Sequence, residues 1–317
     1  MASGFTVATD EHLIRSNLWS KDIQTLLMDD LYGMRFVRVL TDFPDGTTLN
    51  IPIIGEAESS DFAEGMAIKY NKMDTGNFTF EFDQYKYSAN AISEKFKRDS
   101  YYSSEVISAF VPRQHRALME AVETRIFSRG NSGQTASDLN VINNAPHRWV
   151  AKGTSERLTT EDFVRAAYAL QKANVPMTNL VAVVDPSVAV TLQLQTNVTN
   201  LLSPMPMWED VIKNGLVSGL KFRFNLAGFD VYVSNYLPQG IAETIDGKSV
   251  TTGVANQFFS AAPGDTLPII GGFRQMPTVQ SEFNKDLQQT EYLTIAEYGF
   301  KLYRPDNMVV VLSDTDI

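Results

Sequence analysis

The sequence contains no cysteine among its 317 residues. This absence excludes disulfides, zinc–thiolate sites and cysteine nucleophiles together, and it fits a protein made in a reducing cytoplasm. Long apolar runs are missing too, because none approaches the ~18 residues that a membrane span needs. Residues 1–16 lack the basic start and the apolar block of a signal peptide. We therefore expect neither disulfides nor contact with a membrane.

Positive charge is scarce. Lysine and arginine number 27 against 37 for aspartate and glutamate, so the formal net charge is −10. Affinity for phosphate comes from lysine and arginine, and the chain has no basic tail and no basic–aromatic alternation of the kind found in nucleic-acid grooves. We therefore expect no specific binding of nucleic acid. If the protein surrounds DNA, we expect it to enclose the DNA without binding it specifically.

Residues for metal or acid–base chemistry are also few. The three histidines are His12, His115 and His147, and no pair has the spacing of a metal motif such as HExxH. Calcium loops, phosphate-binding glycine loops and the GxSxG nucleophile pattern are absent. We predict no catalytic residue, no metal and no cofactor. His115 fits a surface or interface position, and His147, beside Pro146, fits loop packing.

One carboxylate keeps an enzyme open as an alternative. Asp185 follows an apolar run in VVDPS, and acids at strand ends often do chemistry. The same residue fits a helix N-cap before Pro186 at the first helical position, which is the interpretation that we favour. The alternative is an acidic cytoplasmic α/β enzyme that uses carboxylates such as Asp185, and it predicts a pocket with converging acids.

What the chain does contain is ordinary for a globular protein. Hydrophobic residues make up 44 % and charged residues 20 %, enough for one large or two medium domains. Apolar periodicity and capping residues predict a mixture of helices and strands. We expect helices at 18–33, 101–130, 159–174, from 186 and at 207–215. We expect strands at 36–40, 179–184, in a pair over 220–238, and on both sides of 304–307, with loops at 1–17, 130–144 and 239–255.

The longest helical signal is residues 101–130. Leu118, Val122 and Ile126 recur every four residues and form one apolar stripe. Pro112 is expected to open or kink this helix, and Gly130 is expected to end it.

Residues 41–90 differ from the rest of the chain. They contain nine acidic and three basic residues, which is −6 of the total charge. Phe78, Phe80 and Phe82 alternate with polar residues, as in a half-buried strand, and a second extended run precedes them. The segment therefore predicts a long acidic hairpin. Because a two-stranded hairpin is marginal in water by itself, such an arm needs another surface to lie on, and we expect that surface to belong to another subunit.

The order of these parts resembles a known family. GFDVYVSNYLP (228–238) resembles a recurring strand of the major capsid protein of tailed bacteriophages, which has the Hong Kong 97 fold. VAVVDPSVAVTLQ (181–193) resembles that family's strand followed by a short helix. Its closing strands are resembled by EYGFKLYRPDNMVVVLSD (297–314), and its spine helix by FVPRQHRALMEAVETRIFS (110–128). The resemblance covers most of residues 18–317 and rests on order and spacing.

The resemblance implies an α+β, Hong Kong 97-type capsid fold with four parts. They are an N-terminal arm and short helix (1–41), an extended β-hairpin loop (42–90), a peripheral domain with a long spine helix (91–150 and 272–317) and an axial α/β domain (151–271).

The implied function is that of a major capsid protein, which self-assembles into pentamers and hexamers of an icosahedral shell around a double-stranded DNA genome. The chain would be assembled in the host cytoplasm and found in the virion. Its partners would be copies of itself and a portal, and a decoration protein is a further candidate. From charge, we expect the acidic loop to meet basic residues of a neighbour. The candidate contact residues are Glu56, Glu58, Asp61, Glu64, Lys95, Lys97, Arg98, Arg113 and Arg116.

The chain departs from some members of that family. It has no long helical scaffolding segment before the arm, so a separate scaffolding protein is expected. Some members cross-link a lysine to an asparagine; Lys69 and Lys72 lie in the loop, but we do not predict this bond. A bacterial nanocompartment shell of the same fold is a second alternative. Deleting residues 56–76 should leave a folded subunit that cannot close a stable shell.

Overall fold

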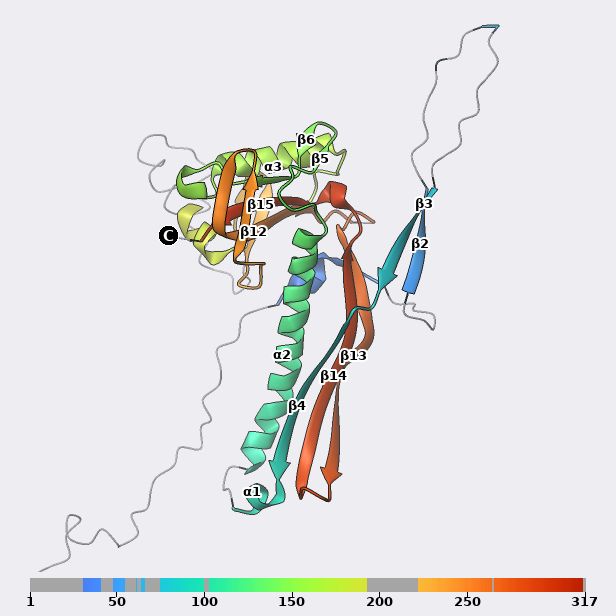
Figure 1. The fold of residues 1–317 in the computed structure, drawn as a ribbon, viewed down its shortest axis with the longest axis vertical. Coiled ribbons are helices and arrows are strands. Elements are labelled where there is room, and N and C mark those ends of the chain that lie inside the picture. The colour runs from blue at the N-terminus through green and yellow to red at the C-terminus, as the bar shows by residue number, and fades with distance from the viewer. Residues whose placement is uncertain are drawn as a thin grey trace, which may run out of the picture.

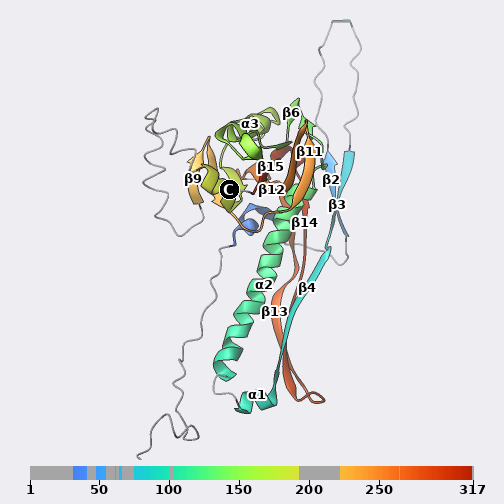
Figure 2. The same cartoon turned by 60° about the vertical axis from the view of Figure 1, so that its left-hand side comes forward.

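The computed structural model describes residues 31–40, 48–54, 61, 64–65, 75–99, 103–192, 222–263 and 265–315. These residues form two β-sheets that share a hydrophobic core, and a two-stranded ribbon projects from them (Figure 1). One sheet is long and narrow with a long helix beside it, and the other is broader and lies near one end of that helix (Figure 2).

The long sheet has four strands in the order β1-β13-β14-β4. The bounds are β1 Val37–Val39, β13 Ile269–Asn284, β14 Gln289–Leu302 and β4 Gln84–Ser93. β13 and β14 pair antiparallel along their full lengths, and β4 pairs antiparallel with β14. The short helix α1 (Glu94–Asp99) follows β4 at the end of the sheet that lies away from the second sheet (Figure 1).

Helix α2 (Ser103–Ser132) lies along one face of this sheet (Figure 2). Leu118, Val122 and Ile126 are buried, as the apolar stripe predicted. Pro112 lies inside the helix and does not open it. The prediction that Gly130 ends the helix was wrong. A Cβ there would lie 2.4 Å from the Gln257 side-chain oxygen, so the glycine serves the close packing of α2 on the second sheet.

The second sheet has seven strands in the order β7-β15-β12-β8-β10-β9, with β11 paired to β12. The bounds are β7 Arg148–Val150, β15 Val309–Asp314, β12 Lys248–Ser260, β8 Leu180–Val184, β10 Phe229–Val233, β9 Phe222–Leu226 and β11 Ile241–Ile245. The predicted strand at 179–184 is confirmed, and the strand pair predicted over 220–238 is present as β9 and β10, with β10 ending at Val233. The tight turn expected between the last two is present, with Ala227 and Gly228 both at positive φ.

β8 shows how this sheet is buried on both faces, because all five of its residues are buried. Leu180, Ala182 and Val184 face a core that includes Phe163 of helix α3 (Thr160–Lys172). Val181 and Val183 face the opposite side. The continuous apolar run is typical of a strand that is covered on both faces. α3 begins with a capping box of Thr159 and Asp162, which confirms the predicted helix start.

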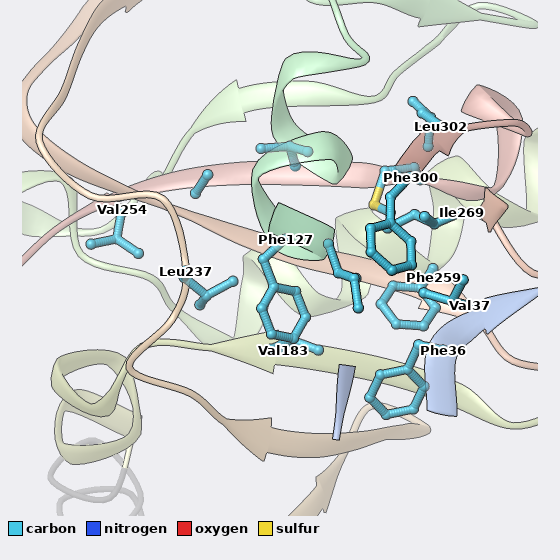
Figure 3. Packing of buried hydrophobic residues seen from close by; sticks show 14 of the residues in the cluster. Phe36, Val37, Phe127, Val183, Leu237, Val254, Phe259, Ile269, Phe300 and Leu302 are labelled. Carbon is cyan, nitrogen blue, oxygen red and sulfur yellow. The ribbon is translucent and has the colours of Figure 1, made fainter. Parts of the chain in front are cut away.

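The opposite side of β8 joins the two sheets. Figure 3 shows side chains of α2, of both sheets and of the short η1 helix (Gly33–Phe36) packed together. The labelled residues are Phe36, Val37, Phe127, Val183, Leu237, Val254, Phe259, Ile269, Phe300 and Leu302. Because these side chains come from segments far apart in the sequence, the core fixes the long sheet, α2 and the broad sheet relative to one another.

The remaining described elements are short, apart from the ribbon. They are β2 Thr48–Ile54, β3 Thr75–Glu81, β5 Val141–Ile142, β6 Ala145–Pro146, η2 Thr154–Glu156 and η3 Pro305–Asn307. η3 interrupts the chain between β14 and β15, as the break at 304–307 predicted. The predicted arm (1–17) and the predicted helix at 207–215 lie outside the described residues, as does most of the predicted helix at 18–33.

The prediction of a loop over residues 239–255 was wrong. β11 and the first half of β12 form a hairpin there, with Asp246 and Gly247 at positive φ in its turn. The Gly-, Thr- and Ser-rich composition hid an alternation in which Ile241 and Ile245 point inward. β11 has weak intrinsic strand propensity. Its pairing with β12, a strand of the broad sheet, stabilises it as a strand.

The sheets divide the C-terminal part of the chain differently from the expected peripheral and axial ranges. Residue 272, the expected boundary, lies inside β13. β15 and β7, which fall within the expected peripheral ranges, pair with each other in the broad sheet, and β15 also pairs with β12. The segments expected in the peripheral domain thus contribute strands to both sheets. The division into peripheral and axial parts stays a prediction.

Candidate interaction surfaces

The ribbon of β2 and β3 is amphipathic. In its antiparallel register Leu49 lies opposite Phe80 and Ile51 opposite Phe78, so these apolar residues share one face. The other face is polar, and there the Thr79 hydroxyl donates to the Asn50 side-chain oxygen at 3.1 Å. The predicted hairpin and the alternation of Phe78 and Phe80 are confirmed in this part of the segment.

The root of the ribbon is held by β14. The Phe80 side chain is fully buried, and the Phe78 ring meets the Tyr303 ring edge-on with 5.1 Å between centroids. The Lys301 ammonium donates to the Thr79 carbonyl oxygen at 2.7 Å and lies 4.9 Å from the Phe78 ring centroid. A Cβ on Gly299 would lie 2.5 Å from the Glu81 carbonyl oxygen, so β14 touches the backbone of the ribbon directly.

Phe82 and Asp83 connect the ribbon to β4, and Asp83 binds the long helix. Its carboxylate accepts hydrogen bonds from Arg125 and Arg129, which lie one turn apart on α2. We call these three residues the Asp83 clamp. Tyr298 of β14 is buried close by. Burial raises the pKa of its hydroxyl and the Asp83 charge adds to this, while the Arg125 charge opposes it.

The face of the long sheet turned away from α2 exposes aromatic side chains. Thr294, Ala296 and Tyr298 of β14 are buried on the side of α2. The residues between them in β14 point away from α2. In the pairing of β14 with β4, Tyr87 lies opposite Ile295 and Tyr85 lies opposite Glu297, so both tyrosines share that face. Tyr85 is 62 % exposed and Tyr87 69 % exposed. At the ribbon end of this face β3 contacts β14, since a Cβ on Gly299 would lie 3.2 Å from the Phe80 ring.

The predicted basic contact residues lie on α1 and α2, where Lys97 and Arg116 have partners within their own helices. The Lys97 ammonium donates to the Glu94 carboxylate at 2.8 Å, and this hydrogen bond lowers the pKa of Glu94. The Arg116 guanidinium donates to the Glu120 carboxylate at 2.8 Å. Lys95 and Arg98 are exposed on α1, and Arg113 is half-buried on α2.

The predicted acidic contact residues belong to the connection between β2 and β3. Asp61 and Glu64 are exposed, while Glu56 and Glu58 lie outside the described residues. The ribbon and α1 lie toward opposite ends of the subunit (Figure 1). Because of this separation, a contact between the acidic set and the residues of α1 would have to join two copies of the chain, and it stays a prediction.

Asp185 has the partners of a helix cap. Its carboxylate accepts from the Ser187 backbone N–H at 2.9 Å and from the Ser187 hydroxyl at 2.6 Å. A helix follows at 186–192, so the predicted cap is confirmed. Among the described residues there is no group of acids and histidines that could hold a metal ion. No helix within them is long and apolar enough to cross a membrane.

The histidines in this part of the chain are separated. His115 is exposed on α2, and His147 is buried in the loop before β7. The Nδ1 atom of His147 lies 3.0 Å from the Ala145 carbonyl oxygen. Burial lowers the pKa of His147, although the Ala145 carbonyl and Asp306 act in the opposite sense.

Three features were not predicted from the sequence. They are the Asp83 clamp, the exposed Tyr85 and Tyr87, and a buried ion pair between Arg148 and Glu243. The spacing of Arg125 and Arg129 was a usable signal, since residues four apart share one helix face. No local signal links Arg148 to Glu243, because these residues meet only through the pairing of strands in the broad sheet.

Comparison of the sequence with protein families gives one match. The model of a family described as phage capsid protein matches residues 82–311, which run from the ribbon's connection with β4 into β15. A search of curated protein sequences returned no match.

Solved structures with a similar fold include phage capsids. A chain in the capsid structure of cyanophage P-SCSP1u matches with a TM-score of 0.72 and 14 % identity, covering 99 % of this chain and 96 % of that one. Ralstonia phage GP4 capsid matches with 0.69 and 9 %, covering 99 % of each chain. Mycobacterium phage Che8 matches with 0.66 and 17 %, covering 94 % of this chain and 97 % of that one.

Proposed function

This chain belongs to the phage capsid protein family, and from that premise we propose how it builds a shell. It is a major capsid protein of an icosahedral phage shell, and its place is the virion. Its fold is the α+β, Hong Kong 97-type capsid fold. The observation that carries this conclusion is the family match over residues 82–311, which includes α2 and most of both sheets.

The finer assignment is to a tailed bacteriophage with a double-stranded DNA genome. Copies of the chain form pentamers and hexamers, and they enclose the DNA without gripping it. The net charge of −10 supports this, because an acidic protein gains little from phosphate contacts. A separate scaffolding protein and a portal take part in assembly, and a decoration protein is a further possible partner.

The ribbon is the arm that holds a neighbouring subunit. At its root Phe80 is buried by the described part of its own chain, whereas Gly76 and Asn77 farther along β3 are exposed. A two-stranded ribbon is marginal in water unless its apolar face is covered. The acidic residues Asp61 and Glu64 at its far end are exposed and face no basic partner among the described residues of their own chain. A single exposed ion pair at the rim of an interface contributes little free energy. Such contacts therefore matter as a set that is repeated over many copies of the chain.

The nanocompartment alternative is not favoured, because the family match and the solved neighbours described above are phage proteins. The enzyme alternative loses its candidate residue, since the Asp185 carboxylate is held in a helix cap.

The first test is to express the chain alone and with the scaffolding protein, and to image the sedimented material by negative-stain electron microscopy. We expect icosahedral shells or rings of capsomer size. A discrete dimer or tetramer in every condition, with nothing larger, would contradict the assignment.

A second test addresses the ribbon. Residues 55–74 are replaced by Asn-Gly, which keeps β2 and β3 and closes them with a two-residue turn. We expect a folded subunit with unchanged secondary structure that forms no stable shell. Normal shells from this variant would refute the role of the arm between neighbours.

A further inference from the structure

The Asp83 clamp lies where the ribbon leaves the body of the subunit. We propose that this clamp sets the direction of the ribbon relative to α2 and thereby decides where the arm lands on a neighbouring copy; this inference rests on the proposed role of the ribbon in assembly. Asp83, Arg125 and Arg129 are positioning residues in this proposal. They act through the backbone of residues 82–83, and they need not touch the neighbour themselves.

The described connection between ribbon and body is narrow. β3 ends at Glu81, β4 begins at Gln84, and only Phe82 and Asp83 lie between them. Phe82 meets the buried Phe80 edge-on, with 5.2 Å between ring centroids. On the far side, β14 approaches so closely at Gly299 that a Cβ would lie 3.1 Å from the Phe82 Cα. The joint is therefore seated on β14, and its other side is held by the arginines of α2.

The chemistry of the clamp suits a fixed angle. Arg125 Nη2 and Arg129 Nη2 both donate to Asp83 Oδ2, so two guanidinium groups hold one carboxylate oxygen. Charge-assisted hydrogen bonds of this kind are shorter and stronger than neutral ones. Arg125 and Arg129 project from consecutive turns of α2, whose apolar stripe is buried against the sheet. All three side chains are about one quarter to one third exposed, at 28 %, 24 % and 32 %, so the contact is only partly screened by water.

A small change at this joint becomes a large displacement at the end of the ribbon. β3 has seven residues, and at ~3.3 Å per residue it extends ~23 Å. A rotation of ~10° about the joint would move the far end by ~4 Å, which is close to the spacing between two paired strands, ~4.8 Å. Without the clamp, the arm would reach a neighbour in many orientations, and docking would have to select one of them at an entropic cost.

The experiment measures the ribbon and the shell separately, in the full-length chain. The variants are Asp83→Asn, the double variant Arg125→Gln/Arg129→Gln, and Asp83→Glu, which keeps the charge. The matched control is Glu161→Gln, which removes an exposed ion pair with Lys152 (3.5 Å) at the start of α3, on the other sheet. Amide hydrogen exchange is followed in the unassembled subunit, and shell formation is followed with the scaffolding protein.

For Asp83→Asn and for the double variant we expect exchange in β2 and β3 to rise about five-fold, the size expected for a partly exposed ion-pair network. Exchange in α2 and β12 should stay unchanged, and the yield of regular shells should fall. Asp83→Glu should recover part of the protection, and Glu161→Gln should behave as the wild type in both measurements.

Three results would overturn the proposal. The first is unchanged exchange in the ribbon, and the second is an equal rise in the ribbon, α2 and β12, which would make the clamp an ordinary stabilising contact. Loose ribbons with normal shell yield would also overturn it. A wild-type chain that forms no shells would contradict the proposed function instead, and the exchange data would still decide whether the clamp holds the ribbon.

Discussion

The buried ion pair between Arg148 and Glu243 gives the sharpest test of the energetics. The Arg148 side chain is 1 % exposed and that of Glu243 is 10 % exposed. Arg148 Nη2 and Nε donate to the two carboxylate oxygens at 2.7 and 3.1 Å, and Nη1 donates to the Asn131 side-chain oxygen at 2.8 Å. Glu243 also accepts from the Ser137 backbone N–H at 3.1 Å. The pair thus ties together β7, β11 and the end of α2.

Glu243→Gln removes the charge and keeps the shape. It leaves a buried guanidinium without its counter-charge, and breaking such a pair costs about 3–5 kcal/mol in other proteins. We expect a value near 3 kcal/mol, because the amide oxygen can still accept one hydrogen bond. At about 2 °C per kcal/mol for a chain of this size, the unfolding midpoint should fall by about 6 °C.

The double variant Arg148→Met/Glu243→Met removes both charges and keeps most of the volume. Because the desolvation cost of both ions disappears with their attraction, its stability should lie within about 1 kcal/mol of the wild type. The assay is thermal and urea unfolding of the unassembled subunit, followed by circular dichroism. A double variant as unstable as Glu243→Gln would refute the argument, since the attraction would then outweigh desolvation.

Two further predictions concern His147 and Gly299. Burial lowers the pKa of His147 below its ordinary value of 6.5. Below pH 6.5 the folded state therefore binds fewer protons than the unfolded state. The free energy of unfolding should fall as the pH drops through 6.5 toward the pKa of the folded state. Urea midpoints at pH 7.5 and 5.0 should differ less in His147→Gln than in the wild type; equal differences would contradict this. Gly299→Ala places a Cβ 2.5 Å from the Glu81 carbonyl oxygen, so the subunit should lose about 1–3 kcal/mol. Hydrogen exchange should rise first in β3, and an unchanged β3 would show that the joint does not need this close approach.

Several elements could be predicted because their signals are local. The stripe of Leu118, Val122 and Ile126 defined the buried face of α2, and Thr159 with Asp162 marked the start of α3. The buried run of β8 and the cap at Asp185 were also visible in the sequence. These patterns depend on neighbours within about one turn of helix or a few residues of strand, so no tertiary information is needed to find them.

Elements whose stability comes from distant partners were missed or misjudged. The hairpin of β11 and β12 looked like a loop, because its strands have weak propensity and gain most of their stability from the broad sheet. Gly130 looked like a helix end, although it serves the contact of α2 with Gln257. Lys97 and Arg116 have partners on their own helices, and their contact with a neighbouring copy stays a prediction.

The sequence by itself determined that the chain has no cysteine chemistry, carries excess negative charge, and contains a long amphipathic helix and an acidic hairpin, because composition and periodicity are local properties. Only the tertiary structure decided which charges meet. Asp83 reaches Arg125 and Arg129 across about forty residues of chain, with sequence separations of 42 and 46, and Arg148 reaches Glu243 across 95. Such contacts depend on how two sheets pack around one core, and the energy that fixes this packing is the burial of apolar surface shared by segments far apart in the chain.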